Sequence, residues 1–207
     1  MAEERVSIPV ENAKMELEGL FEAGRTGRNA MLCHPHPLYG GDMHNNVVQA
    51  ARLTFASLGW ATLRFNFRGP GPGNPAGGQR DPLDLMDVST FMNSRSPGRM
   101  DFAGYSYGAW ALMEAVRAGL YADCLILISP PLDFLSFEEL EPVGIPTLIT
   151  LGTRDEFCSV RSLENWLSTS PAPTATTVEL LPEVDHFYRG AERQISEIIK
   201  TFLHRLA

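Results

Sequence analysis

The stretch RMDFAGYSYGAWALMEAVR (residues 99–117) predicts the fold more strongly than any other part of this chain. Residues 99–103 have the apolar character of a buried strand, and AWALMEAV (109–116) has the small and apolar residues of a helix. Between them lies GYSYG (104–108), which matches Gly-x-Ser-x-Gly. In a strand–turn–helix setting this pattern forms a nucleophile elbow, a tight turn that needs small flanking residues and raises the serine hydroxyl above the sheet. We therefore predict that Ser106 is a nucleophile.

Short apolar runs alternate with helical patterns on both sides of this elbow. We expect strands at 5–10, 14–21, 29–33, 60–67, 99–103, 124–128, 146–151 and 176–181, and helices at 45–58, 81–94, 106–118, 159–168 and 191–206. The first two strands should pair antiparallel across Glu11–Asn12. The later alternation predicts one α/β domain over residues 1–207, with a mainly parallel sheet of about seven or eight strands and helices on both faces.

A serine hydroxyl is a weak nucleophile and needs a base. After a nucleophile elbow of this kind, the partners follow along the chain in the order serine, acid, histidine. His186 follows the last predicted strand in the loop PEVDHFY, and only His204, inside the last predicted helix, comes later. His186 is therefore the predicted base.

The acid should leave the end of a strand between the serine and the histidine. Asp155 does so, just after PTLITLG (146–152), and would orient the imidazole and stabilise its charged form. The same aspartate can instead cap a helix or pair with Arg154. Glu156, Asp185 and Asp133 are the other candidates, of which Asp133, after an earlier strand, is the strongest.

An oxyanion formed at the substrate carbonyl needs backbone N–H donors. The N–H of Tyr107, directly after the nucleophile, is the first predicted donor. The second should come from the loop HPHPLYGG (34–41), where two prolines have no N–H to give. This leaves His36 as the predicted donor and Leu38 as the alternative.

Composition excludes several other classes of function. The 207 residues include 17 Lys and Arg against 25 Asp and Glu, which gives a formal net charge of −8. The sequence contains no run of basic residues, so we expect no nucleic acid partner. No apolar run reaches the roughly 18 residues that a membrane span needs, and the first residues lack the apolar region of a secretory signal.

The cysteines and histidines do not suggest a metal or a cofactor. Three scattered cysteines at positions 33, 124 and 158 suit reduced thiols in a cytoplasm, and we expect Cys158 to be partly exposed. His34, His36 and His44 have no acidic cluster beside them, and prolines fix the backbone between the first two. We therefore predict no metal and no cofactor.

Five segments together resemble a known family. They are CHPHPLYGGDMHNNVV (33–48), LRFNFRG (63–69), AGYSYGAWA (103–111), LGTRDEF (151–157) and VDHFYRG (184–190). They are similar to small bacterial α/β-hydrolases with an HPHPxxGG signature, which are described as predicted esterases and are distantly related to dienelactone hydrolases. The resemblance covers nearly the whole chain and implies a compact α/β-hydrolase fold with Ser106, Asp155 and His186 at the triad positions.

The chain departs from that family at GPGPGNPAGGQ (69–79), where the family usually continues with Gly-x-Ser and an acidic residue. The resemblance therefore leaves one wall of the substrate pocket unpredicted. A lid in this fold often enters after the strand that follows the nucleophile helix, and here that connection (129–146) has room only for a turn and one short helix. We expect little or no lid and an open cleft.

These observations together predict a serine hydrolase that cleaves small carboxylic esters with short acyl chains through an acyl-enzyme. An apolar, partly aromatic pocket is expected from Leu38, Tyr39, Tyr105, Phe134 and Phe157. The alternatives are a thioesterase or a peptidase with the same triad, and a ligand-binding relative whose triad is silent. The expected partner is a small-molecule ester, and a homodimer remains open.

Overall fold

The computed structural model describes residues 2–10, 15–69, 81–138, 140, 144–168 and 175–206. Its strands are β1 (Glu4–Val10), β2 (Met15–Glu22), β3 (Arg28–Cys33), β4 (Ala61–Phe65), β5 (Arg99–Tyr105), β6 (Cys124–Ile128), β7 (Thr147–Gly152) and β8 (Thr176–Leu181). Its helices are α1 (Asn46–Ser57), α2 (Asp81–Arg95), α3 (Tyr107–Arg117), α4 (Val160–Ser168) and α5 (Glu192–Arg205), with a short 3₁₀ helix η1 (Pro37–Tyr39). Every predicted strand and helix is present, and only η1 was not predicted.

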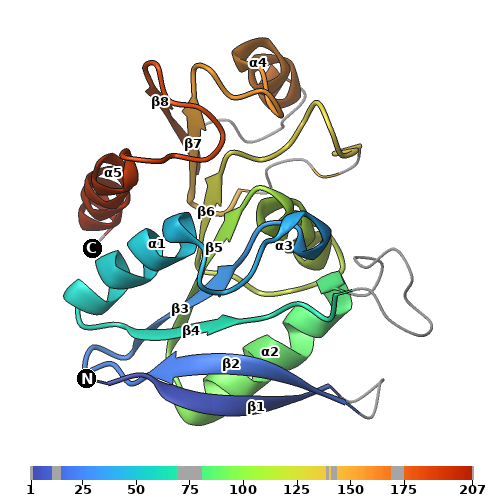
Figure 1. The fold of residues 1–207 in the computed structure, drawn as a ribbon. Coiled ribbons are helices and arrows are strands. Elements are labelled where there is room, and N and C mark those ends of the chain that lie inside the picture. The colour runs from blue at the N-terminus through green and yellow to red at the C-terminus, as the bar shows by residue number, and fades with distance from the viewer. Residues whose placement is uncertain are drawn as a thin grey trace.

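The described strands form one eight-stranded sheet in the order β1-β2-β4-β3-β5-β6-β7-β8 (Figure 1). The pairs β1–β2 and β2–β4 are antiparallel, and all pairs from β4–β3 to β7–β8 are parallel. This confirms the prediction of a mainly parallel sheet with an antiparallel start. The central strands β4, β6 and β7 are buried along their whole length, and the unbroken apolar run of β6 is typical of a strand covered on both faces.

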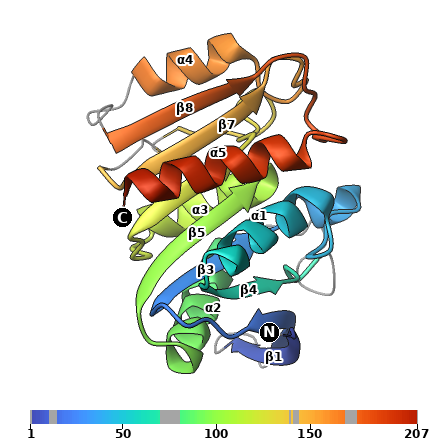
Figure 2. The same ribbon diagram turned by 90° about the vertical axis from the view of Figure 1, so that its left-hand side faces the viewer.

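Helices cover both faces of the sheet and divide the core in two. On one face α1 and α5 lie side by side, and Figure 2 shows both in front of the strands. Their buried side chains share one apolar cluster that includes Phe55, Ile195 and Ile199. On the other face, α2, α3 and α4 contribute to a second cluster that includes Leu85, Leu112 and Leu163. The sheet is thus held rigidly from both sides, which fixes the loops at its edges.

The loops that follow the parallel strands meet at the carboxyl edge of the sheet. Strands β3 and β5 run side by side in a register that pairs Cys33 with Gly104, so the loops after these two strands start next to each other. The described residues between β6 and β7 form turns without a helix. Residues 70–79 of the predicted irregular loop lie outside the described residues. Among the helices of the described residues, none has the length and apolar character of a membrane span.

Candidate active site

Ser106 occupies the sharp turn between β5 and α3. Its backbone has φ 54° and ψ −120°, a strained conformation for a residue with a side chain. It is the N-cap residue of α3, but its side chain makes no capping hydrogen bond, so the hydroxyl is available on the cleft side. Its N–H donates to the Ile128 carbonyl (2.8 Å), and its own carbonyl accepts from the Ala109 N–H (2.9 Å). The regular elements on both sides therefore hold the strained turn.

Two glycines allow this turn to form. A Cβ at Gly104 would lie 2.5 Å from the carbonyl oxygen of Gly108. A Cβ at Gly108 would lie 2.3 Å from the carbonyl oxygen of Cys33, at the end of β3. Both positions face backbone, so a side chain there would require a strand or a helix to shift. The glycine at 108 also brings the end of β3 into direct contact with the start of α3.

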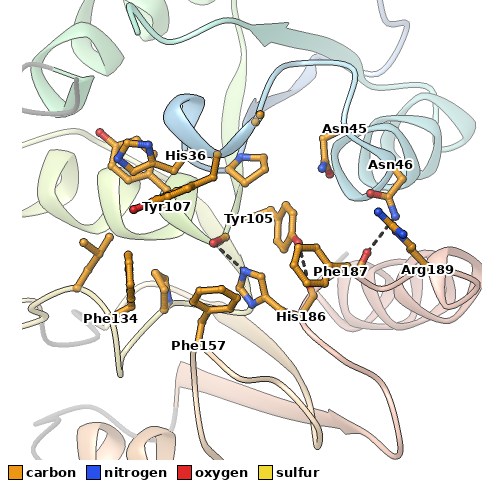
Figure 3. A pocket seen from close by; sticks show the side chains of 17 residues that line it. His36, Asn45, Asn46, Tyr105, Tyr107, Phe134, Phe157, His186, Phe187 and Arg189 are labelled. Atoms are coloured by element: carbon orange, nitrogen blue, oxygen red, sulfur yellow. Dashed lines mark hydrogen bonds between the residues drawn. The ribbon is translucent and has the colours of Figure 1, made fainter. Parts of the chain in front are cut away.

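Ser106, His186 and Asp155 are joined by hydrogen bonds, although they follow three different strands. Figure 3 shows the position of His186 in the site. His186 Nδ1 lies 2.9 Å from each carboxylate oxygen of Asp155, and Nε2 lies 2.9 Å from Ser106 Oγ. Since a carboxylate can only accept, Nδ1 carries the proton and Nε2 accepts from the serine hydroxyl. His186 is only 4% exposed and Asp155 9%.

The backbone of its own loop fixes the Asp155 carboxylate. Oδ1 accepts the N–H groups of Phe157 (2.9 Å) and Cys158 (3.1 Å). This turn buries Cys158 to 1% exposure, so the expectation that this thiol is partly exposed was wrong. Burial raises the pKa of the Cys158 thiol to about 12, which keeps it protonated.

The other acidic candidates have different contacts. Asp133 accepts the Ser159 N–H (2.6 Å) and the Ser162 hydroxyl, and so caps the start of α4. Asp185 accepts the N–H of Phe187 within its own turn. Arg154 pairs with Glu183, not with Asp155. Of the weighed carboxylates, Asp155 is the one in contact with His186.

Two tyrosines that the sequence interpretation did not connect with His186 hold its loop. The Tyr105 hydroxyl donates to the His186 carbonyl oxygen (2.7 Å). Tyr188 has φ 54°, is fully buried, and its hydroxyl lies 2.8 Å from Ser129 Oγ. Desolvation raises the pKa of both phenols, so both stay protonated. No local pattern signals these contacts, because each joins residues far apart in the sequence.

The loop after β3 faces the elbow across the cleft. The His36 ring caps η1, because its Nδ1 accepts the Leu38 N–H (3.2 Å). The N–H of Leu38, the alternative oxyanion donor, is therefore already used. The N–H of His36 makes no hydrogen bond within the described part of the chain, and His36 lines the cleft.

Tyr107, the other predicted donor, is the first residue of α3. Its ring packs between His36 (centroids 4.5 Å apart) and Trp110 (5.3 Å). Its hydroxyl donates to Oδ2 of Asp81 (2.8 Å), a fully buried carboxylate at the start of α2 whose pKa is raised by desolvation. The side chain of Tyr107 thus links the elbow to α2.

The three histidines of the first loop do not converge. His34 is buried with both ring nitrogens engaged by backbone groups. His44 is exposed, and its Nδ1 lies 3.3 Å from Arg64 Nη1. Within the described ranges, no group of three or more His, Cys, Asp or Glu is placed to hold a metal ion.

A cleft of about 640 Å³ opens above Ser106. Its described lining residues are Pro35, His36, Tyr39, Gly40, Gly41, Asn45, Asn46, Tyr105, Ser106, Tyr107, Pro131, Phe134, Leu135, Phe157, His186, Phe187 and Arg189. Four of the five predicted pocket residues are among them. Leu38 is not among them, so that part of the prediction was wrong, and its side chain is 51% exposed.

The cleft has an apolar and a polar end. Figure 3 shows Phe134 and Phe157 on one side of His186, and Asn46 and Arg189 on the other. Tyr39 (74% exposed) and Phe134 (55% exposed) form an open rim. The sequence interpretation missed the polar end, whose asparagines begin α1 and whose arginine follows the His186 loop.

This arrangement has a definite chemical capacity. A serine hydroxyl that donates to an imidazole can lose its proton to Nε2 while its oxygen attacks an electrophilic carbon. A buried carboxylate on Nδ1 keeps the imidazole in the required tautomer and stabilises its charged form. A free backbone N–H nearby can receive the negative charge that develops on the attacked carbonyl oxygen.

No model of a known protein family matches this sequence. The sequence is 31% identical over 184 residues to the uncharacterized protein RP471 of Rickettsia prowazekii, and the match covers 84% of this chain and 77% of that protein.

Solved structures share the fold over nearly the whole chain. XC6422 from Xanthomonas campestris, a member of the α/β serine hydrolases without a lid, superposes with a TM-score of 0.86 at 24% identity and covers 100% of this chain and 95% of its own. An α/β serine hydrolase homologue from Coxiella burnetii gives a TM-score of 0.84 at 25% identity and 97% coverage of both chains. The esterase Pf2001 from Pyrococcus furiosus gives 0.79 at 16% identity, covering 98% of this chain and 92% of its own.

Proposed function

Since this chain belongs to the family of the Rickettsia prowazekii protein RP471 and has the lidless α/β-hydrolase fold, we propose that it is a serine hydrolase of small carboxylic esters with short acyl chains. Its structural neighbours are α/β serine hydrolases and esterases, which supports a hydrolase. The observation that carries the proposal is the continuous hydrogen-bonded chain from Ser106 through His186 to Asp155 beneath an open cleft.

In the proposed acylation step, Ser106 Oγ attacks the ester carbonyl carbon and its proton moves to His186 Nε2. Asp155 stabilises the imidazolium that results. The carbonyl oxygen becomes an oxyanion that accepts hydrogen bonds from the N–H groups of His36 and Tyr107. When the tetrahedral intermediate collapses, the bond to the alcohol oxygen breaks, and this oxygen takes the proton from Nε2.

In the proposed deacylation step, water takes the place of the departed alcohol. His186 Nε2 accepts a proton from the water as its oxygen attacks the acyl carbon of the ester formed with Ser106. The second tetrahedral intermediate uses the same two N–H donors. Its collapse releases the carboxylic acid and returns the proton to Ser106 Oγ.

The apolar end of the cleft supports the choice of a short acyl group. Phe157 packs against the His186 ring (centroids 4.6 Å apart), and Phe134 packs against Phe157 (5.7 Å). An acyl chain laid on these rings would leave water while its carbonyl stays at Ser106. The exposed rim formed by Tyr39 and Phe134 gives a long chain little further surface to cover it.

Labelling with a fluorophosphonate probe and mass spectrometry tests the proposal directly. We expect the probe on Ser106 and hydrolysis of p-nitrophenyl acetate and butyrate at higher kcat/KM than of p-nitrophenyl laurate. Ser106→Ala should lose both labelling and turnover, by roughly 10⁴-fold or more. The exposed Ser94 of α2 offers a matched control, since Ser94→Ala should retain both. Turnover by Ser106→Ala at the wild-type rate would refute the proposal.

A thioesterase or a peptidase would use the same three residues. Parallel kinetics on an acetyl oxygen ester, acetyl-CoA and a small peptide amide separate these reactions. We expect the oxygen ester to have the highest kcat/KM. A higher value for either of the other two would move the assignment to that class while leaving the roles of Ser106, His186 and Asp155 unchanged.

A further inference from the structure

The HPHP motif contains a histidine with no part in the proposed reaction. His34 is 1% exposed, and its ring packs against Phe67 (centroids 4.7 Å apart). Its Nδ1 lies 2.6 Å from the carbonyl oxygen of Pro35, and its Nε2 lies 2.9 Å from the backbone nitrogen of Phe67. A carbonyl can only accept and a backbone N–H can only donate, so Nδ1 carries the ring proton and Nε2 carries none.

The carbonyl that His34 holds belongs to the same peptide unit as the His36 N–H. A trans peptide is planar, and its C=O and N–H point in opposite directions. Fixing the Pro35 oxygen against the buried His34 ring therefore fixes the direction of the His36 N–H, which is turned away from that ring. Both Pro35 and His36 line the cleft, so this peptide borders the space above Ser106.

Gly41, at the other end of the loop, packs directly against the Pro35 carbonyl oxygen of the same peptide. A Cβ at Gly41 would lie 2.1 Å from the Pro35 oxygen and 2.8 Å from the His36 oxygen. The Gly41 N–H donates to the His36 carbonyl (3.1 Å). A rotation of the peptide would have to displace Gly41 as well as break the His34 bond.

We infer that His34 is a positioning residue, which directs the His36 N–H toward the oxyanion by holding the Pro35 carbonyl. Gly41, packed against the same carbonyl, prevents this peptide from rotating. This inference rests on the proposed function. It also gives His34 and Gly41 of the HPHPxxGG segment a task beside that of His36. Pro37 begins η1, and the His36 ring caps that turn.

The electrostatics of His34 agree with a neutral ring that donates a hydrogen bond to the Pro35 carbonyl. Desolvation lowers the pKa of His34 to about 4. Asp42, His36, and the Pro35 carbonyl are the groups whose charge or dipole faces the ring. Above about pH 5 the ring is neutral, and Nε2 keeps its lone pair for the Phe67 N–H.

Substitutions at position 34 test the inference through the split between kcat and KM. His34→Ala removes the donor to Pro35 and should lower kcat for p-nitrophenyl butyrate by about 10- to 100-fold, with KM within about threefold. His34→Asn offers an amide N–H close to the position of Nδ1 and should restore at least part of this loss. Gly41→Ala should resemble His34→Ala. The matched control is His44→Asn, on the same segment but exposed, which should keep the wild-type kcat.

A trifluoromethyl ketone inhibitor adds a readout that a merely structural role would not move. It forms a tetrahedral oxyanion on Ser106, so His34→Ala should weaken its binding by the same factor as kcat/KM. Wild-type kcat in a folded His34→Ala, or a fall in kcat with unchanged ketone affinity, would overturn the inference while the proposed function stands. A wild-type protein that neither hydrolyses esters nor reacts with a fluorophosphonate would overturn the proposed function first.

A nitrogen NMR measurement on the wild-type protein decides the matter if the variants do not fold. Imidazole ¹⁵N shifts should show His34 protonated at Nδ1 and unprotonated at Nε2 between pH 6 and 8. The Nε2-protonated tautomer could not donate to Pro35, so its observation would overturn the inference without any measurement of activity.

Discussion

The elbow at residues 104–108 and the facing loop at residues 34–41 both bring backbone to Ser106, but different interactions hold them. The elbow lies between a buried strand and a buried helix, and its backbone hydrogen bonds continue theirs. The facing loop has three residues of 3₁₀ helix with a few short-range backbone hydrogen bonds, and two side chains hold it as well, with His34 on the Pro35 carbonyl and the His36 ring on the Leu38 N–H.

This difference predicts how each region fails. A change in the elbow disturbs the contact between β5, β3 and α3, and therefore the core of the protein. A change in the facing loop disturbs the direction of one peptide and leaves the sheet in place. The elbow should thus be sensitive in folding, and the loop in turnover.

The largest expected effect comes from Gly108→Ala in the elbow. The new Cβ would lie 2.3 Å from the Cys33 carbonyl oxygen, so β3 or α3 must move. We expect a loss of at least about 4 kcal/mol of stability, measured by urea unfolding, and with it the loss of activity. The control is Gly119→Ala, which has open space around it and only the backbone strain of its φ of 106°, and should cost about 1–3 kcal/mol. Equal stability of the two variants would break the comparison.

The same contrast explains what the sequence could predict. Strands and helices follow from the period of apolar residues, which is a local signal, and the elbow combines such a strand and helix with a short motif. The carboxyl edge of a parallel sheet then gathers the loops after β5, β7 and β8, so Ser106, Asp155 and His186 could be chosen by their positions alone.

Side-chain directions inside short loops could not be predicted in this way. Leu38 was expected in the pocket, but a three-residue turn can present any of its side chains, and Leu38 is 51% exposed and does not line the cleft. Cys158 was expected to be exposed, but the Asp155 carboxylate binds its N–H and draws it inward. The His34 contact with Phe67 joins residues 33 positions apart and has no local pattern.

Asp155→Asn should have the next largest effect. It separates the two roles of the Asp155 side chain, which are to interact with His186 and to hold the backbone of its own loop. An asparagine oxygen can still accept the N–H groups of Phe157 and Cys158, so the loop should keep its shape. Its amide cannot stabilise the charged imidazole of His186 and favours the wrong tautomer. We expect kcat to fall by about 10³- to 10⁴-fold with little change in Tm. Near wild-type kcat would remove Asp155 from the proposed reaction.

Two substitutions of His36 sharpen the comparison by separating its backbone from its ring. Its φ of −61° suits proline, so His36→Pro removes the N–H at a φ that proline can adopt. His36→Ala removes the ring and keeps the N–H. We expect His36→Pro to lower kcat by about 10²- to 10³-fold, and His36→Ala by less than about fivefold. A large loss in His36→Ala would instead give the ring itself a part in the reaction.

The smallest expected effect concerns the pH dependence of stability and belongs to the side-chain-held loop. Burial lowers the pKa of folded His34 to about 4 from the usual 6.5. Between these values the unfolded chain binds a proton that the folded protein does not, so the stability from this group is complete above pH 6.5 and lost as the pH falls toward 4.

Urea unfolding of wild type and His34→Asn at pH 7.5 and 4.5 measures this contribution. Relative to the variant, the wild type should lose about 2–3 kcal/mol between the two pH values. The buried Asp81 has a raised pKa and therefore stabilises the fold as the pH falls, but it is present in both proteins and cancels in the difference. An equal pH dependence of the two proteins would mean that His34 titrates normally. The ring would then be accessible to water, and the loop would not be held by a buried, neutral histidine.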